Sequence, residues 1–265
     1  MGPWIHSGAS GEGTLTIFTT AKFVFPDGNT RSKGVPMDFD QRVDQKMESK
    51  SWCVEWFGSQ GDFIAGKSKE PVLLERFAGL ESLYAVGPLE QARGEVSIYD
   101  GVPLISEVEH GRINVSIDLC RRAAFLVYAI VENWRRATVS APIAGEQQLR
   151  EHLLPLAVES GIDVDQPFPF LVYCYVASAT FHVLCHRTEG EYSPKLHEQA
   201  KVRFPIADES VEIVGFYSSQ HRGIFTPRDS DWHMHVRTLD NRVAGHLEAF
   251  NLPQGVMLYL PVNER

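Results

Sequence analysis

The sequence predicts a mixed α/β protein in which β-sheet dominates the C-terminal half. Three observations support this fold class. Stretches rich in β-branched and aromatic residues recur late in the chain, at 170–187, 210–218 and 255–261. Residues 94–105, GEVSIYDGVPLI, alternate apolar and polar side chains around Asp100-Gly101, which is typical of a tight hairpin. Residues 145–161 have a helical pattern that Pro155 disturbs and Gly161 closes.

The remaining segments have less regular patterns. Residues 1–20 are rich in Gly and Ser and predict a flexible N-terminal arm. Within 21–80, FVFPDGNTR predicts a strand and turn, and PVLLERFAGL predicts a short amphipathic helix. Residues 118–134 are apolar enough for a buried strand or a helix, and periodicity does not decide between them.

A shift in composition near Gly161–Pro167 is the only internal boundary that the sequence indicates. It predicts an N-terminal α/β subdomain over residues 21–160 and a β-rich subdomain over residues 161–265. A chain of 265 residues with 43% hydrophobic residues is long and apolar enough for either one large domain or two modest ones.

The charge and the apolar runs exclude some partners. A formal charge of −9 disfavours non-specific binding to nucleic acid, whose phosphates would repel such a surface. No run approaches the roughly 18–20 apolar residues that a membrane helix requires. The N-terminal residues have no basic region followed by an apolar one, as a secretion signal would, so we expect a cytoplasmic protein with no membrane partner.

The four cysteines are scattered and form no CxxC pair; they are Cys53, Cys120, Cys174 and Cys185. Neither a zinc ribbon nor a thioredoxin-like redox site is therefore indicated. Free thiols in a reducing compartment are the expected state.

Three of the ten histidines lie within fourteen positions, in the segment DWHMHVRTLDNRVAGHLEAF. If Asp240-Asn241 is a two-residue hairpin turn, His235 lies directly opposite His246, and His233 shares their face. Glu248 would then lie opposite His233. The other face would be apolar and suited to a core; it would carry Trp232, Met234, Val236, Val243, Leu247 and Ala249.

Three converging imidazoles suit a borderline divalent ion such as Zn²⁺ or another divalent transition metal. With three protein ligands the ion keeps open positions, which is the pattern of a catalytic site. The histidines of an isolated HxH pair more often lie at the surface or make ordinary hydrogen bonds. The third histidine, opposite the pair in the predicted hairpin, is what favours the metal site. A jelly-roll cupin would also use HxH, but it would require a glutamate shortly afterwards, where this chain has only Asp240.

The segment WHMHVRTLDNRVAGH resembles the zinc site of the α-acetolactate decarboxylases, whose pattern is H-x-H, a D-D/N-R turn and then G-H. VGFYSSQHRG is similar to the strand and turn that lead into that site. VGPLEQARGEVSIYDG is similar to a family stretch whose glutamate falls at Glu95, and FHVLCHR to a strand whose functional arginine falls at Arg187. The resemblance covers roughly residues 60–260 and is fragmentary in the middle.

The resemblance implies a fold of two β-sheet-based subdomains with the metal between the sheets, commonly in a homodimer. Family members also supply a second glutamate from a C-terminal tail, whereas this chain ends nineteen residues after His246. Glu248 and Glu264 are the candidates for that role, and the motif assigns neither. The first sixty residues do not resemble the family.

The function that follows is a zinc-dependent carboxy-lyase that converts a small 2-hydroxy-3-keto acid to a hydroxyketone, such as acetoin, and CO₂. His233, His235 and His246 would hold the metal, Glu95 would carry a proton and Arg187 would hold the substrate carboxylate. One alternative is a relative with changed chemistry, such as another carbon–carbon lyase, an isomerase or a cyclase. A second alternative is a non-catalytic binding protein that the metal stabilises.

Overall fold

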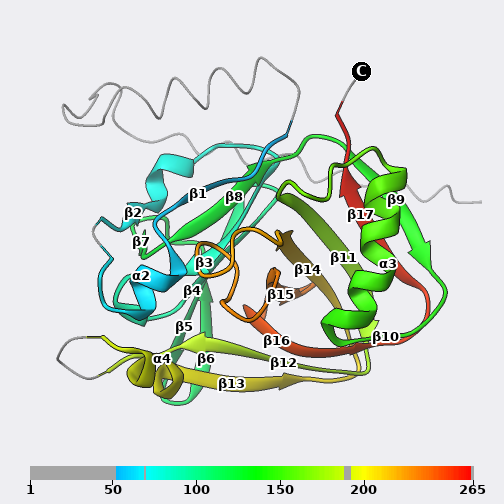
Figure 1. Ribbon diagram of the computed structural model, residues 1–265. Coiled ribbons are helices and arrows are strands. Elements are labelled where there is room, and N and C mark those ends of the chain that lie inside the picture. Colours follow the sequence, from blue (N-terminus) through cyan, green and yellow to red (C-terminus); the bar gives the residue numbers. More distant parts are fainter. Residues whose placement is uncertain (1–51, 69, 188–191, 264–265) are drawn as a thin grey trace, which may run out of the picture. The chain divides into compact units, whose positions relative to one another are not determined.

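The structure is a computed structural model that describes residues 52–68, 70–187 and 192–263. These residues form two large antiparallel β-sheets, a small two-stranded sheet and a few helices (Figure 1). The fold is therefore sheet-rich with mixed α/β content, as the sequence predicts. The predicted N-terminal arm and the FVFPDGNTR strand lie outside the described residues.

The first large sheet has six strands in the order β1-β8-β3-β4-β5-β6. The hairpin predicted around Asp100-Gly101 joins β4 to β5, and both turn residues have positive φ, 50° and 76°, as the tightest hairpin turns require. Residues 118–134, which periodicity left open, contain strand β8. The six strands are β1 (Glu55–Phe57), β3 (Leu83–Pro88), β4 (Glu95–Tyr99), β5 (Val102–Glu109), β6 (Arg112–Ser116) and β8 (Leu126–Ile130).

The second large sheet has the order β13-β12-β16-β15-β14-β11-β17-β9, and β10 pairs with part of β16. The apolar stretch 170–187 is divided between β11 and β12, which do not pair with each other. The strands are β9 (Trp134–Val139), β10 (Ile143–Ala144), β11 (Phe168–Val176), β12 (Ser178–Leu184), β13 (Lys201–Ile206), β14 (Glu209–Tyr217), β15 (Trp232–Thr238), β16 (Ala244–Leu252) and β17 (Val256–Pro261).

The helices are short except for α3 (Gly145–Glu159), which contains Pro155 as predicted. The predicted helix in PVLLERFAGL is wrong, because Val72 and Leu73 pair with β7 (Arg122–Ala123) as strand β2 and leave only a 3₁₀ turn at Leu74–Phe77. The other helical segments are α2 (Gln60–Ile64), α4 (Pro194–Ala200) and a 3₁₀ turn at Glu90–Ala92. Among the described residues, no helix combines the length and the apolar character needed to cross a bilayer.

Two large hydrophobic cores among the described residues hold the large sheets in place. One lies between the large sheets and joins residues such as Val86 and Val127 to Val214 and Phe216. The other lies on the opposite face of the nine-stranded sheet, where Leu149 and Leu153 of α3 are fully buried. The nine-stranded sheet therefore has one face toward the smaller sheet and one toward α3, which also crosses it in Figure 1.

The described residues all belong to one compact unit. Strands β9 and β10 precede residue 161 but pair with β17 and β16, which follow it. The predicted subdomains 21–160 and 161–265 thus share the nine-stranded sheet.

Candidate metal centre

The histidine hairpin forms in the predicted register. Strands β15 and β16 pair antiparallel with His235 directly opposite His246. The connection is longer than the predicted two-residue turn, because Thr238 N–H bonds Val243 O at 3.1 Å and residues 239–242 form the loop. Asn241 lies in that loop with a φ of 58°, a left-handed conformation that Asn tolerates. The loop is centred on Asp240-Asn241, so the register is unchanged.

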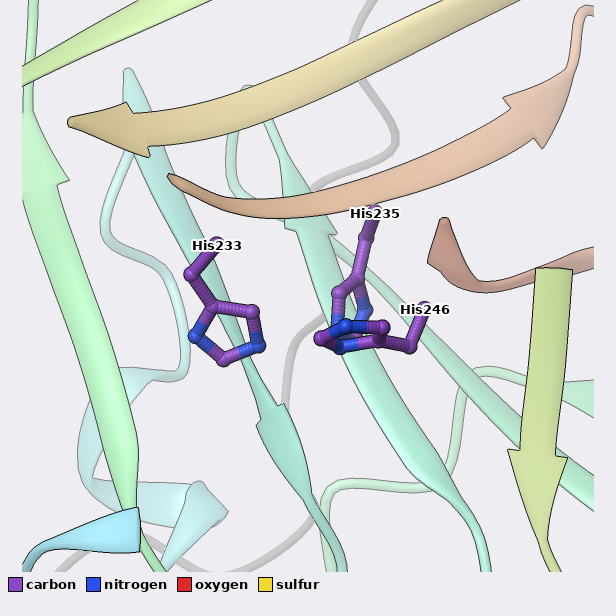
Figure 2. Close-up of side chains that lie close together, drawn as sticks. All are labelled: His233, His235 and His246. Atoms are coloured by element: carbon purple, nitrogen blue, oxygen red, sulfur yellow. The ribbon is translucent and has the colours of Figure 1, made fainter. Parts of the chain in front are cut away.

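The three imidazoles gather on one side of this hairpin, as Figure 2 shows. One ligand atom from each of His233, His235 and His246 lies within 4.8 Å of the other two. The first two histidines are fully buried, and His246 is partly exposed. This spacing lets a single ion of the size of Zn²⁺ contact all three nitrogens after small side-chain movements.

Hydrogen bonds set the orientation of two of the rings. The Nδ1 of His233 lies 2.7 Å from Phe225 O, and because a carbonyl only accepts, that nitrogen donates and leaves Nε2 with a free lone pair. The Nδ1 of His235 lies 2.8 Å from the Ser97 hydroxyl. The Nε2 of His235 is buried and has no hydrogen-bond partner among the described residues. A buried ring nitrogen without a hydrogen-bond partner, beside two other imidazoles, fits a metal ligand.

The electrostatics of the cluster favour neutral rings. Burial lowers the pKa of His233 to about 4. Burial also lowers the pKa of His235 and His246 well below the usual value, and the neighbouring histidines add to the effect. Neutral imidazole is the form that binds a metal, so the site has its ligands ready at neutral pH.

The opposite, apolar face of the hairpin packs into the core as predicted, except at Ala249. Trp232, Met234, Val236 and Leu247 are buried, and Val243 packs against the same core. Ala249 is exposed, because the pairing of β16 with β12 shifts by one residue at Glu248. Such a bulge inverts the side-chain alternation beyond it.

His182 also lies at the site, although the histidine motif does not include it. It is buried on β12, directly opposite His246, with ring centroids 4.7 Å apart. Gly245 permits this approach, since a Cβ there would lie 2.6 Å from His182 O. The alternation of buried Phe181 and Val183 puts His182 on the other face of its strand, but the sequence does not indicate that β12 lies beside β16.

Glu95 reaches the same cluster from the smaller sheet. Its carboxylate oxygens lie 3.8 Å from His235 Nε2 and 3.8 Å from His182 Nε2, and its side chain is 2% exposed. Burial raises the pKa of Glu95 well above its usual value. Glu95 shares a strand face with Ser97 and Tyr99, as the alternation of this strand requires, and the hydroxyls of both bond His235. Strand β4 therefore supplies both the carboxyl group and the support for one imidazole.

A pocket of about 190 Å³ opens over the cluster. Its wall includes Glu95, His182, His233 and His246, together with apolar side chains such as Phe63 of α2 and Leu184 of β12, and two cationic residues, Lys201 and Arg228. A cavity of this size suits a small molecule with a few polar groups.

The other predicted residues lie in different places. Arg187 is exposed, with its guanidinium 3.3 Å from Val108 O, and it does not line this pocket. Glu248, at the bulge, lies 3.0 Å from His182 Nδ1 and also bonds Arg203. Glu264 lies outside the described residues.

Comparison with known proteins gives a likeness in structure and none in sequence. No family model matches the chain, and no curated protein matches it in sequence. The solved structure of α-acetolactate decarboxylase from Bacillus subtilis strain 168 superposes with a TM-score of 0.61 at 13% identity, covering 78% of this chain and 85% of that one. A Staphylococcus aureus protein of unknown function, described as similar to α-acetolactate decarboxylase, gives 0.60 at 14% identity, with 79% and 85% covered.

The acetolactate decarboxylase from Bacillus subtilis subspecies spizizenii gives a TM-score of 0.61 at 12% identity, covering 78% of this chain and 85% of that one. Identities this low relate the folds and leave the chemistry of this chain to its own residues. The chain has a fold similar to that of the α-acetolactate decarboxylases, with three histidines positioned to bind a metal ion.

Proposed function

We propose that this protein is a metal-dependent carboxy-lyase of acetolactate type, which releases CO₂ from a small 2-hydroxy-3-keto acid and yields a hydroxyketone. The observation that carries the proposal is the buried His235 Nε2, which has no hydrogen-bond partner among the described residues and lies beside two more neutral imidazoles. A buried carboxyl group 3.8 Å away, on a fold like that of the acetolactate decarboxylases, adds to it.

Loss of CO₂ breaks the bond between the carboxylate carbon and C2, and the electron pair left behind delocalises onto the neighbouring carbonyl oxygen. A divalent ion such as Zn²⁺, held by His233, His235 and His246, would supply a Lewis acid for that oxygen. A proton must then reach carbon. We assign this step to Glu95, since burial raises its pKa and favours the protonated form that can give a proton.

His182 gives Glu95 a path by which to regain its proton. Its two ring nitrogens lie 3.8 Å from Glu95 and 3.0 Å from Glu248, and Glu248 is 22% exposed. A chain of carboxyl, imidazole and carboxylate therefore leads from the buried acid toward solvent. The resemblance assigns the substrate carboxylate to Arg187, and that role stays a prediction, as does the homodimer.

The direct test is acetoin release from racemic acetolactate by the purified, zinc-loaded protein. The proposal expects turnover above the spontaneous rate in the wild type and none above that rate in His235→Ala. Equal acetoin release by the two proteins would contradict it.

The His182–Glu248 pair favours a second candidate, a carbon–carbon lyase of the same type that acts on a different keto acid. This pair adds an imidazole and a carboxylate to the three histidines and Glu95. Wild-type protein that is inactive on acetolactate but releases CO₂ from another 2-hydroxy-3-keto acid would support this candidate over the first.

A further inference from the structure

The pocket contains a second polar group, formed by Gln60 and Arg228, that the chemistry above does not use. Gln60 is the first residue of α2, and its backbone N–H bonds Ile224 O at 2.7 Å. The next residue, Gly61, bonds Gly223 O at 2.8 Å. These two bonds fix the start of α2 to the turn that precedes Arg228, and so they bring the two side chains to one part of the pocket wall.

Gln60 has an unused hydrogen-bonding atom in this wall. Its side chain belongs to a residue only 8% exposed, and the Oε1 has no partner among the described residues. Buried polar atoms without a partner are rare in folded proteins. One that lies in a pocket wall is available to a ligand that can donate a hydrogen bond.

Arg228 supplies a positive charge next to this amide. Its side chain runs along Gly223 and Gly61; a Cβ on Gly61 would lie 3.5 Å from one of its guanidinium nitrogens. Within the described part of the chain, no residue forms a hydrogen bond or ion pair with that guanidinium. The other cation in the wall, Lys201, already pairs with Glu198 at 2.9 Å. Arg228 is therefore the cation left for a ligand, although Asp229 beside it limits the local excess of positive charge.

We propose that Gln60 and Arg228 bind the 2-hydroxy-carboxylate end of the ligand. The guanidinium pairs with the carboxylate, for which its fork of donors is suited, and the amide oxygen of Gln60 accepts a hydrogen bond from the adjacent hydroxyl. This assignment rests on the proposed function, because it concerns the same pocket. It makes the site selective for 2-hydroxy acids over acids that lack the hydroxyl group.

The test uses two unreactive acids that differ only in the hydroxyl, 2-hydroxyisobutyrate and isobutyrate. Their affinities are measured by NMR titration of the full-length protein, both zinc-loaded and chelator-treated, so that chelation of the ion does not mask the contribution of the wall. Arg228→Ala should weaken both acids by about tenfold to a hundredfold. Gln60→Met should weaken 2-hydroxyisobutyrate by about fivefold and leave isobutyrate unchanged.

Arg136→Ala is the matched control, since it removes an exposed arginine on β9, at the far end of the sheet from β12 and β16. It should leave both affinities at the wild-type value. Wild-type affinity in Arg228→Ala, or an equal loss for both acids in Gln60→Met, would overturn the assignment. If Gln60→Met does not fold, Gln60→Glu replaces it, and its added negative charge should weaken both acids.

The outcomes separate this inference from the proposed function. A protein that releases no acetoin but shows the predicted pattern of affinities keeps the subsite and loses the acetolactate reaction. A protein that releases acetoin with the same KM in wild type, Arg228→Ala and Gln60→Met keeps the reaction and loses the subsite.

Discussion

Ser97 Oγ and His235 Nδ1 lie 2.8 Å apart although the two residues come from different sheets. The contact engages Nδ1 of the His235 ring and leaves Nε2 without a hydrogen-bond partner among the described residues. Tyr99, two residues further along the same strand, donates to the backbone carbonyl of His235 at 3.1 Å. The smaller sheet thus positions one ligand of a site whose three histidines all belong to the larger sheet.

Removal of this support should weaken metal binding without unfolding the protein. We expect Ser97→Ala to lower zinc affinity by about tenfold to a hundredfold, as for other residues that orient a ligand histidine. Ser106→Ala is the control, because it deletes an equally buried hydroxyl that has no partner among the described residues. Competition with a chelating dye measures both affinities. Equal affinity in the two variants would show that Ser97 does not orient the ring.

Glu95→Gln tests the proton step. Glutamine keeps the shape of the protonated carboxyl group but cannot release a proton, so kcat should fall by about 10² to 10⁴. Zinc content should stay at the wild-type level, because Glu95 is not one of the three proposed ligands. Steady-state assays and elemental analysis check the two expectations. Near wild-type turnover would exclude Glu95, and Glu248 and Glu264 would be tested next.

Arg187→Ala tests the residue that the resemblance assigns to the substrate carboxylate. If Arg187 holds that group, its loss should raise KM and lower kcat together, since the carboxylate is bound in the ground state and departs as CO₂. Arg187 and Arg228 are alternative partners for the same carboxylate. Arg187 is exposed and bonds Val108 O, whereas Arg228 lines the pocket, so the kinetics of Arg187→Ala and Arg228→Ala distinguish between the two assignments. Unchanged kinetics in Arg187→Ala would remove this residue from the site.

The buried histidines predict a pH dependence for the metal-free protein. Their pKa is lowered in the folded state, to about 4 for His233, so between that value and about 6.5 the unfolded chain binds protons that the folded chain does not. The stability that these histidines contribute is therefore fully present above about pH 6.5 and is lost as the pH falls toward 4. Each such histidine adds up to about 1.4 kcal/mol per pH unit to that slope.

Urea denaturation at several pH values measures this slope. His233→Gln should flatten it, whereas His110→Asn, which replaces an exposed histidine in a turn, should leave it unchanged. If the free energy of unfolding changed with pH by the same amount in wild type and in His233→Gln, folding would not lower the pKa of His233.

The sequence alone was enough to predict the hairpin and the cluster it carries. Alternation and the Asp240-Asn241 centre determine the register, so the pairing of His235 with His246 follows from local information. The face shared by Glu95, Ser97 and Tyr99 follows from alternation in the same way. These relations span few residues, and strand geometry determines them.

The remaining parts of the site depend on contacts between distant segments. His182 reaches the cluster because β12 pairs with β16, and Gln60 reaches the pocket wall because α2 bonds the turn at residues 221–226. The bulge at Glu248 exposes Ala249, which alternation alone would bury. Strand order and bulges arise from tertiary packing, which a single sequence does not display.

The metal site itself is the central claim, and metal content of the purified protein tests it most directly. Elemental analysis of wild type and His235→Ala, each loaded with zinc and dialysed, should find about one divalent ion per chain in the wild type and little in the variant, with native-like far-UV spectra for both. No bound metal in the wild type, or full occupancy in His235→Ala, would contradict the account.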